Sequence, residues 1–257
     1  MYAFIFCCQP ENQLVQQPVT DYHAQILALS RYVLHHLRGF MNTVTLMLAK
    51  KSVHSITPSK VVCIGRNYVD HIKELANEVP DEMVVFIKPN SAISSALFSQ
   101  HNGDVLHYEA ELSFLYQGGK FTAVALGLDL TKREVQGKLK AKGLPWERAK
   151  AFDKSAIFSD FVEVEQEDVE QLTLSLLIND ELKQQGGVAL MMAKPSEILK
   201  ELQTFVTLED GDIVMTGTPK GVGVINHNDK FIGQLYLSQQ DTLTTNKVLL
   251  DCQWQAQ

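Results

Sequence analysis

The chain contains many short apolar runs of the kind that form β-strands, and they are not joined into a regular β-α-β repeat. Strand-like runs occur at KVVCIG (60–65), DEMVVFIKP (81–89), YEAELSFLY (108–116), TAVALGLDLT (122–131), LTLSLLIND (172–180) and DGDIVMTG (210–217). Beyond residue 60, helical periodicity occurs at about 67–79, 132–142 and 195–205. This pattern disfavours a doubly wound dinucleotide-binding fold. It predicts a mixed, mainly antiparallel fold, mainly β or α+β in class, with short decorating helices.

Composition excludes several classes of protein. The chain has 257 residues, 45% of them hydrophobic, so it is long enough to bury a sizeable core. A net charge of −7 argues against nucleic acid or an anionic membrane as the main partner. No apolar run approaches the roughly 18 residues of a membrane span. Four cysteines without C-x-x-C or disulfide-like spacing indicate reduced thiols, so we expect a cytoplasmic location.

The first forty residues differ in character from the rest. Residues 9–19 are rich in glutamine, and residues 20–38 have the pattern of a modest amphipathic helix. The opening MYAFIFCC has no basic region before it and no cleavage site after it, which argues against a signal peptide. We interpret residues 1–40 as an extension that need not belong to the fold, and 41–257 as the catalytic domain. The alternative is a helix used in packing or assembly.

A histidine and a glutamate follow the first buried strand in the segment GRNYVDHIKE. His71 and Glu74 are three residues apart, so on a helix they lie on one face within reach of each other. A carboxylate that touches an imidazole orients it and raises its basicity, as a general base requires. The competing interpretation is a solvated helix in which Glu74 only pairs with Lys73.

Three carboxylates form a candidate metal site. Glu109 and Glu111 alternate in a strand and therefore point to the same side, which could also be plain solvent. Asp129 lies in the apolar segment GLDLT, where a lone charge is costly unless it is paired or bound to a metal. An all-oxygen set suits Mg²⁺, Mn²⁺ or Ca²⁺ rather than zinc.

Further polar residues follow these carboxylates. Arg133 and Gln136 share a helix face just after Asp129, and Lys150 ends the segment GLPWERAK. Arg133 and Lys150 would bind a carboxylate or stabilise an enolate, or they are surface charges. Thr218 lies in the segment MTGTPKGVG, which has no P-loop spacing and forms either a ligand-contacting loop or an ordinary tight turn.

Taken together, these segments resemble the fumarylacetoacetate hydrolase superfamily, most closely its short acylpyruvase and oxaloacetate decarboxylase-like members. The matching motifs span roughly residues 60–233 in the family's order and are KVVCIGRNYVDHIKEL, VVFIKPNSAI, HYEAEL, GLDLTKREVQ, GLPWERAKAFD and EDGDIVMTGTPKGVGV. The resemblance implies a mixed β-roll fold and usually a homodimer. In this sequence, the interval between Glu111 and Asp129 is shorter than in the family by about one helix, which bears on one pocket wall.

The resemblance also implies the roles of the site residues. It implies a Mg²⁺ or Mn²⁺ site made by Glu109, Glu111 and Asp129. It makes His71 and Glu74 the general-base dyad, on a lid-like helix, and Lys150 the partner of an oxyanion or enolate. The residues that would line the substrate site are Arg66, Arg133, Gln136 and Thr218.

The implied substrates are small 2-oxo acids. We expect acylpyruvate C–C hydrolysis or oxaloacetate decarboxylation. The first alternative is an isomerase of the same family, acting on the oxaloacetate enol or on a dioate such as 2-hydroxyhepta-2,4-diene-1,7-dioate. The second alternative is a non-catalytic metal- or ligand-binding protein, against which the presence of both His71 and Glu74 argues.

Overall fold

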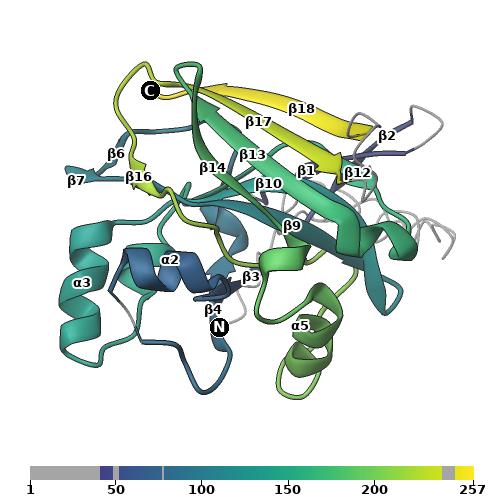
Figure 1. Ribbon diagram of the computed structural model, residues 1–257, viewed down its shortest axis with the longest axis horizontal. Helices are drawn as coiled ribbons and strands as arrows, with labels where there is room; N and C mark the ends of the chain where they lie inside the picture. Colours follow the sequence, from purple (N-terminus) through teal and green to yellow (C-terminus); the bar gives the residue numbers. More distant parts are fainter. Residues whose placement is uncertain (1–40, 49–51, 77, 239–246) are drawn as a thin grey trace, which may run out of the picture. The chain divides into compact units, whose positions relative to one another are not determined.

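The computed structural model describes residues 41–48, 52–76, 78–238 and 247–257. The expected extension over residues 1–40, with its helix at 20–38, lies outside these residues, so both remain predictions. The fold is mainly β with short helices, and the strands form one large mixed sheet, one smaller antiparallel sheet and two short pairs (Figure 1). No β-α-β repeat occurs among the described strands, as the sequence predicts.

The large sheet has ten strands. Its main path runs β2-β1-β12-β10-β9-β15-β3-β4, and β11 and β5 are attached beside β10. The pairs β1–β12, β15–β3 and β5–β11 are parallel and the others are antiparallel. The strands are β1 (Val44–Met47), β2 (Val53–Ile56), β3 (Lys60–Gly65), β4 (Val84–Pro89), β5 (Ile93–Ser94), β9 (Ala110–Gln117), β10 (Lys120–Asp129), β11 (Ala156–Phe158), β12 (Phe161–Glu163) and β15 (Ile213–Met215).

The smaller sheet has the order β14-β13-β17-β18. Its strands are β13 (Leu172–Ile178), β14 (Glu181–Gly187), β17 (Lys230–Leu237) and β18 (Lys247–Gln255). The short pairs join β6 (Gln100–His101) to β7 (Asp104–Val105), and β8 (His107–Tyr108) to β16 (Gly223–Val224). In the view of Figure 1, β17 and β18 lie at the top of the described part of the chain and α2, α3 and α5 at the bottom.

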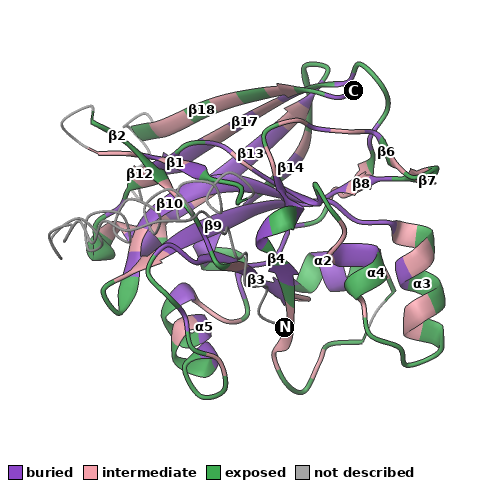
Figure 2. Ribbon diagram, turned by 180° about the vertical axis from the view of Figure 1, so that it is seen from behind, coloured by how far each residue is buried: buried purple, intermediate pink, exposed green. Residues whose placement is uncertain are grey.

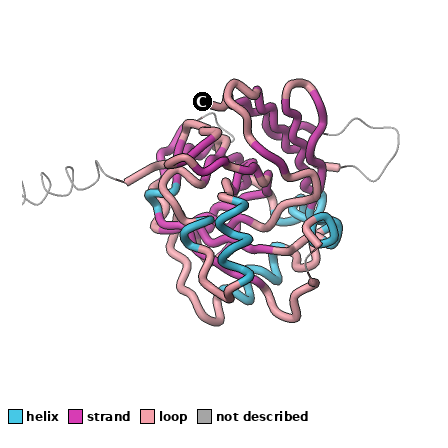
Figure 3. The backbone as a smooth tube through the Cα atoms, turned by 90° about the vertical axis from the view of Figure 1, so that its left-hand side faces the viewer, coloured by secondary structure: helices cyan, strands magenta, loops and turns pink. Residues whose placement is uncertain are grey.

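The helices are short. They are α2 (Val69–Glu74), α3 (Arg133–Ala141), α4 (Glu147–Lys150) and α5 (Pro195–Leu202), with 3₁₀ turns η2 (Asn90–Ala92), η3 (Gln166–Gln171) and η4 (Val188–Leu190). Figure 3 shows how little of the backbone they occupy beside the strands. Helix α2 is shorter than the pattern over 67–79 predicts, because Ala76 takes a left-handed conformation with φ of 49°. None of the described helices has the length and apolarity that a membrane crossing requires.

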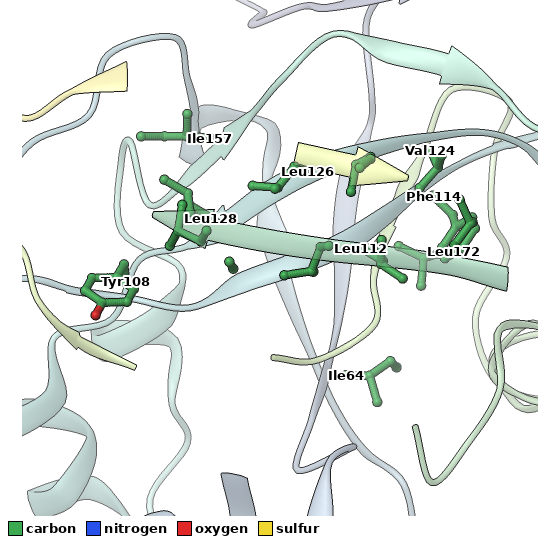
Figure 4. Close-up of a cluster of buried hydrophobic side chains, with 14 of the residues drawn as sticks. Ile64, Tyr108, Leu112, Phe114, Val124, Leu126, Leu128, Ile157 and Leu172 are labelled. Atoms are coloured by element: carbon green, nitrogen blue, oxygen red, sulfur yellow. The ribbon is translucent and has the colours of Figure 1, made fainter. Parts of the chain in front are cut away.

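The main core lies between the two sheets, and a second core lies on the opposite face of the large sheet. Strand β10 contributes to both because its residues alternate: Val124, Leu126 and Leu128 point to the main core, whereas Ala123 and Ala125 point to the second. Figure 4 shows the main core around these leucines, and Figure 2 shows β9 and β10 buried along most of their lengths. Strands β9 and β10 are therefore rigid supports for the side chains at their ends.

A tight hairpin replaces the missing helix between Glu111 and Asp129. Gly118 and Gly119 have φ of 56° and 86°, which glycine adopts at little cost, and they join β9 directly to β10. Glu111 lies six residues from Gln117, the last residue of β9, so the turn is roughly 20 Å from the carboxylates at ~3.3 Å per residue. The turn at the shortened interval is therefore far from the carboxylates along the strands.

Candidate active site

The three carboxylates predicted from sequence converge at one end of the β9–β10 pair. Glu111 pairs with Gly127 across the strands, and the Asp129 backbone N–H donates to the Glu109 carbonyl at 2.9 Å. One oxygen from each side chain lies within 4.8 Å of the others. Their exposed fractions are 6% for Glu109, 2% for Glu111 and 1% for Asp129. The interpretation of Glu109 and Glu111 as solvent-facing is therefore wrong.

Buried cations face this acidic cluster. Lys150 Nζ, at the end of α4, donates to Glu109 Oε2 at 2.8 Å and to Asp129 Oδ2 at 2.6 Å. Arg133 forms an ion pair with Glu109 from the start of α3. Lys88 Nζ, on β4, lies 2.9 Å from Asp129 Oδ1 and has no solvent exposure. Three cations are thus paired with Glu109 and Asp129, and neither Lys150 nor Arg133 is a surface charge.

The surroundings of Glu109 and Glu111 shift their pKa values in opposite directions. Burial alone would raise the pKa of Glu109, but Lys150 and Arg133 outweigh it and hold the pKa well below its ordinary value. Burial and then the charges of Asp129 and Glu109 raise the pKa of Glu111 well above its ordinary value. Burial would lower the pKa of Lys150, but Asp129 and Glu109 raise it overall, so Lys150 stays charged.

The cluster has the donor set that a hard divalent cation needs. Asp129 Oδ1 is buried and accepts no hydrogen bond. Lys88 lies near it, but the Lys88 ammonium donates to the Lys150 carbonyl, the Ser155 carbonyl and Ser155 Oγ. The cluster therefore combines three carboxylates, mutual repulsion at Glu111 and one unsatisfied oxygen. These features fit Mg²⁺ or Mn²⁺.

The predicted dyad forms on α2, and its histidine lines the same cavity as the carboxylates. His71 Nδ1 lies 3.1 Å from Glu74 Oε2, and Glu74 Oε1 accepts a hydrogen bond from the Gly221 N–H at 2.9 Å. His71 is 7% exposed and Ile72 beside it is 1% exposed, so this face of α2 is packed inward. The interpretation as a solvated helix is therefore wrong for His71.

The structure also brings the remaining predicted residues to this cavity. Its lining includes Arg66, His71, Glu109, Glu111, Asp129, Arg133, Gln136, Lys150 and Thr218. Arg133 Nη1 donates to Gln136 Oε1 at 2.8 Å, which fixes the pair on α3. Thr218 Oγ1 donates to the Ala110 carbonyl at 2.9 Å and is buried. The catalytic and binding roles of these residues stay predictions.

Backbone geometry explains why the Gly/Pro turn after β15 approaches the site so closely. Gly217 has φ of 93°, and a Cβ there would lie 2.9 Å from the Asn67 Cβ. The Gly217 N–H is thereby directed at Glu111 Oε2, at 2.7 Å. The Asn67 side chain donates to the carbonyl of Thr216, just after β15, and to the carbonyl of Ala193, before α5, each at 2.9 Å.

Sequence reasoning missed two residues of the site, Lys88 and Lys140, and underestimated a third. Lys88 holds Asp129 from β4, and nothing in the local pattern of that strand distinguishes it from a surface lysine. Lys140 lines the cavity from α3, seven residues after Arg133 and four after Gln136, so helical spacing could have identified it. Trp146, interpreted as packing, lines the cavity and lies under the Lys140 ammonium at 4.9 Å.

Comparison with known sequences decides the family. Residues 60–246 match the model of the fumarylacetoacetate (FAA) hydrolase family, C-terminal region. The chain belongs to the fumarylacetoacetate hydrolase family. This confirms the resemblance inferred from six motifs, and the protein is an enzyme of the hydrolase, decarboxylase and isomerase kind found in this family. The alternative of a non-catalytic binding protein is therefore set aside.

Similar sequences include two oxaloacetate tautomerases. YcgM from Escherichia coli is 40% identical over 188 residues, which cover 67% of this chain and 86% of that protein. The human mitochondrial protein FAHD1 is 40% identical over 186 residues, which cover 66% of this chain and 84% of that protein.

Two solved structures of the family share the fold. A putative fumarylacetoacetate isomerase/hydrolase from Oleispira antarctica has a TM-score of 0.72 and 34% identity, and the match covers 82% of this chain and 98% of that one. Fumarylpyruvate hydrolase from Pseudomonas aeruginosa, in complex with Mn²⁺ and pyruvate, has a TM-score of 0.70 and 26% identity, with 83% and 95% covered. The prediction of a mainly β family fold is confirmed.

Proposed function

We propose that this protein is a divalent-metal-dependent tautomerase that interconverts the keto and enol forms of oxaloacetate. The observation that carries the proposal is a buried histidine, paired with a carboxylate, in the same cavity as a buried acidic cluster of metal-binding type. The two relatives named oxaloacetate tautomerase, at 40% identity, support this substrate. From the sequence alone, hydrolysis or decarboxylation was expected and tautomerisation was the first alternative; the proposal now prefers tautomerisation.

The acidic cluster is proposed to bind Mg²⁺ or Mn²⁺ through Glu109, Glu111 and Asp129. When bound, such an ion polarises a 2-oxo group and stabilises the negative charge of an enolate. The family structure with Mn²⁺ and pyruvate supports this choice of ion. Lys88 and Lys150 hold Asp129 in place beside the other two carboxylates.

His71 would move the proton. Its Nδ1 faces Glu74, so Nε2 is the nitrogen left for substrate. In the keto-to-enol direction, His71 Nε2 takes a proton from C3 and the electron pair of that C–H bond forms the C2–C3 double bond. The 2-oxo oxygen then carries the negative charge and takes a proton from solvent to give the enol, and the His71 imidazolium releases the C3 proton to solvent, so no net proton is gained or lost. Glu74 stabilises the imidazolium that His71 becomes.

Lys150 and the residues beside it would hold the substrate. Because Lys150 stays charged, it stabilises negative charge that develops on the oxygen without donating its own proton permanently. Gln136 is buried and tied to Arg133, so its amide group presents a fixed orientation to a bound acid. Thr218 shapes the wall opposite through its bond to the Ala110 carbonyl.

C–C hydrolysis of an acylpyruvate is the second candidate. It is favoured by the fold shared with the fumarylpyruvate hydrolase that holds Mn²⁺ and pyruvate. The same His71–Glu74 pair would then take a proton from water, and that water would attack the distal carbonyl. Decarboxylation of oxaloacetate needs no attacking water, so it remains a third outcome of the same site.

A side-by-side assay with Mg²⁺ tests the proposal. Ketonisation of enol-oxaloacetate, CO₂ release from oxaloacetate and pyruvate release from acetylpyruvate are measured on one preparation. The proposal expects ketonisation to have the highest kcat/KM by at least about tenfold. A larger kcat/KM for acetylpyruvate would replace it with the hydrolase. The expected homodimer, the cytoplasmic location and the expected absence of nucleic-acid and membrane partners remain predictions.

A further inference from the structure

Two cations of the cavity have no acidic partner among the described residues. Arg133 and Lys150 are ion-paired with the acidic cluster. Among the described residues, Arg66 instead has the Glu78 carbonyl as its one hydrogen-bond partner, at 3.5 Å, and its Nε is buried without a hydrogen bond. In the described part of the chain, the Lys140 ammonium makes no hydrogen bond or ion pair and lies 4.9 Å from the ring centroid of Trp146.

These two residues come from different elements and meet at the same cavity. Arg66 follows β3, and Lys140 lies in the last turn of α3, on the face that carries Arg133 and Gln136. Helix α3 lies beside α4 in Figure 2, which brings Trp146 under Lys140. The ring thus holds the ammonium toward the cavity.

The environment of Lys140 is unfavourable for its charge in the free protein. Burial, followed by the positive charges of Arg66 and Arg133, lowers the pKa of Lys140 to about 8. A half-buried ammonium beside two guanidinium groups gains from an anion in a way that a solvated lysine does not. The acidic cluster does not provide that anion, because Glu109 and Asp129 are already paired with Lys88, Lys150 and Arg133, and no ion pair joins Lys140 to any carboxylate of the described residues.

We propose that Lys140, together with Arg66, binds the distal carboxylate of a 2-oxo diacid and so selects diacids over 2-oxo monoacids. The proposal rests on the proposed function, because the 2-oxo acid end of the substrate is placed at the acidic cluster. Lys140 then contributes to affinity and specificity, whereas the proton moves at His71. This division of roles rests on one observation: within the same cavity, Arg133 and Lys150 are ion-paired with the acidic cluster, whereas Arg66 and Lys140 are not.

The test compares two ligands that differ in one group. Oxaloacetate carries the distal carboxylate, and 2-oxosuccinamate replaces it with a neutral carboxamide of the same shape. Binding of each ligand is measured by calorimetry on the full chain with Mg²⁺, together with KM and kcat for ketonisation. Lys140→Met removes the charge and keeps the length of the side chain, and Lys140→Arg keeps the charge. Lys138→Met, on the exposed face of the same helix, is the matched control.

Lys140→Met is expected to weaken oxaloacetate binding by about tenfold or more, the usual effect of losing a charge-assisted hydrogen bond. KM should rise more than kcat falls. Binding of 2-oxosuccinamate should change by less than about twofold, and Lys140→Arg should retain most of the preference for the diacid. Lys138→Met should match the wild type throughout.

Two results would overturn the proposal. One is an equal loss for both ligands in Lys140→Met, which would show a general effect on the site. The other is a wild-type protein that binds the two ligands equally well. If the wild type binds the diacid selectively but does not accelerate ketonisation, the proposed function fails while the role of Lys140 stands, because the calorimetric comparison needs no turnover.

Discussion

Replacing Lys88 with methionine should destabilise the protein strongly although Lys88 is absent from the proposed proton transfer. Lys88 has no solvent exposure, and its ammonium lies 2.9 Å from Asp129 Oδ1. Lys88→Met keeps the length of the side chain and removes its charge. The acidic cluster would then hold three buried carboxylates against only Lys150 and Arg133.

The magnitude follows from what each lost contact leaves behind. Removing one partner of a buried ion pair costs about 3–5 kcal/mol, because the other charge stays buried. The lower end applies here because the other acceptors keep a donor: the Ser155 carbonyl still accepts from the Leu130 N–H, and the Lys150 carbonyl from Ser155 Oγ. Asp129 also keeps Lys150. We therefore expect a loss of about 3 kcal/mol in the free energy of unfolding.

Urea unfolding measures this loss, with Lys138→Met as the control on an exposed lysine. Added Mg²⁺ should restore part of the stability of Lys88→Met, because a bound cation supplies the missing positive charge. If Lys88→Met does not fold, the double variant Lys88→Met, Asp129→Asn should recover folding, because it removes the stranded charge. A loss below about 1 kcal/mol, with no response to Mg²⁺, would refute the reasoning.

Three further predictions concern the metal, the N-terminal residues and pH. Chelation should abolish activity and Mg²⁺ or Mn²⁺ restore it, and Asp129→Asn should weaken metal binding severely in a metal titration; full activity in excess chelator would contradict this. Deleting residues 1–40 should leave a folded, active protein by circular dichroism and assay, because the site residues lie between Arg66 and Thr218; aggregation or loss of a dimer would show that these residues are structural. Because Lys140, flanked by Arg66 and Arg133, has a pKa near 8, its cation is present below that pH and lost above it. KM for oxaloacetate should therefore rise by up to about tenfold per pH unit above 8. An equal rise of KM in Lys140→Met would show that Lys140 is not the group that causes it.

Much of the fold is predictable because its central strands carry their own signal. Strands β3 and β10 are apolar along most of their lengths, which indicates burial on both faces whatever their neighbours are. Helix α3 was expected over 132–142 and spans Arg133–Ala141. The order of the strands in the sheet was not predictable, because β15 inserts between β9 and β3 although it follows β9 by about 100 residues and β3 by about 150 in the chain.

In the candidate site, too, some features were predictable from the sequence and others were not. The spacing of His71 and Glu74 predicts their contact, because a helix brings residues i and i+3 together. The burial of Glu109 and Glu111 was not predictable from their alternation, because it depends on Lys150, Arg133 and the Gly217 N–H, all distant in sequence. Local patterns report the periodicity of a segment, and they do not report what packs against it.

The most direct test of the account is the rate of enol-oxaloacetate ketonisation in His71→Ala at saturating Mg²⁺. The account predicts a fall in kcat of ~10²–10⁴, the usual contribution of a positioned general base. Mg²⁺ affinity should stay near that of the wild type, because His71 is not among the three metal-binding carboxylates. Adding Glu74→Ala should lower the rate far less than multiplicatively, since both residues act on the same step. A His71→Ala protein that binds Mg²⁺ normally and ketonises oxaloacetate within about threefold of the wild-type rate would contradict the account.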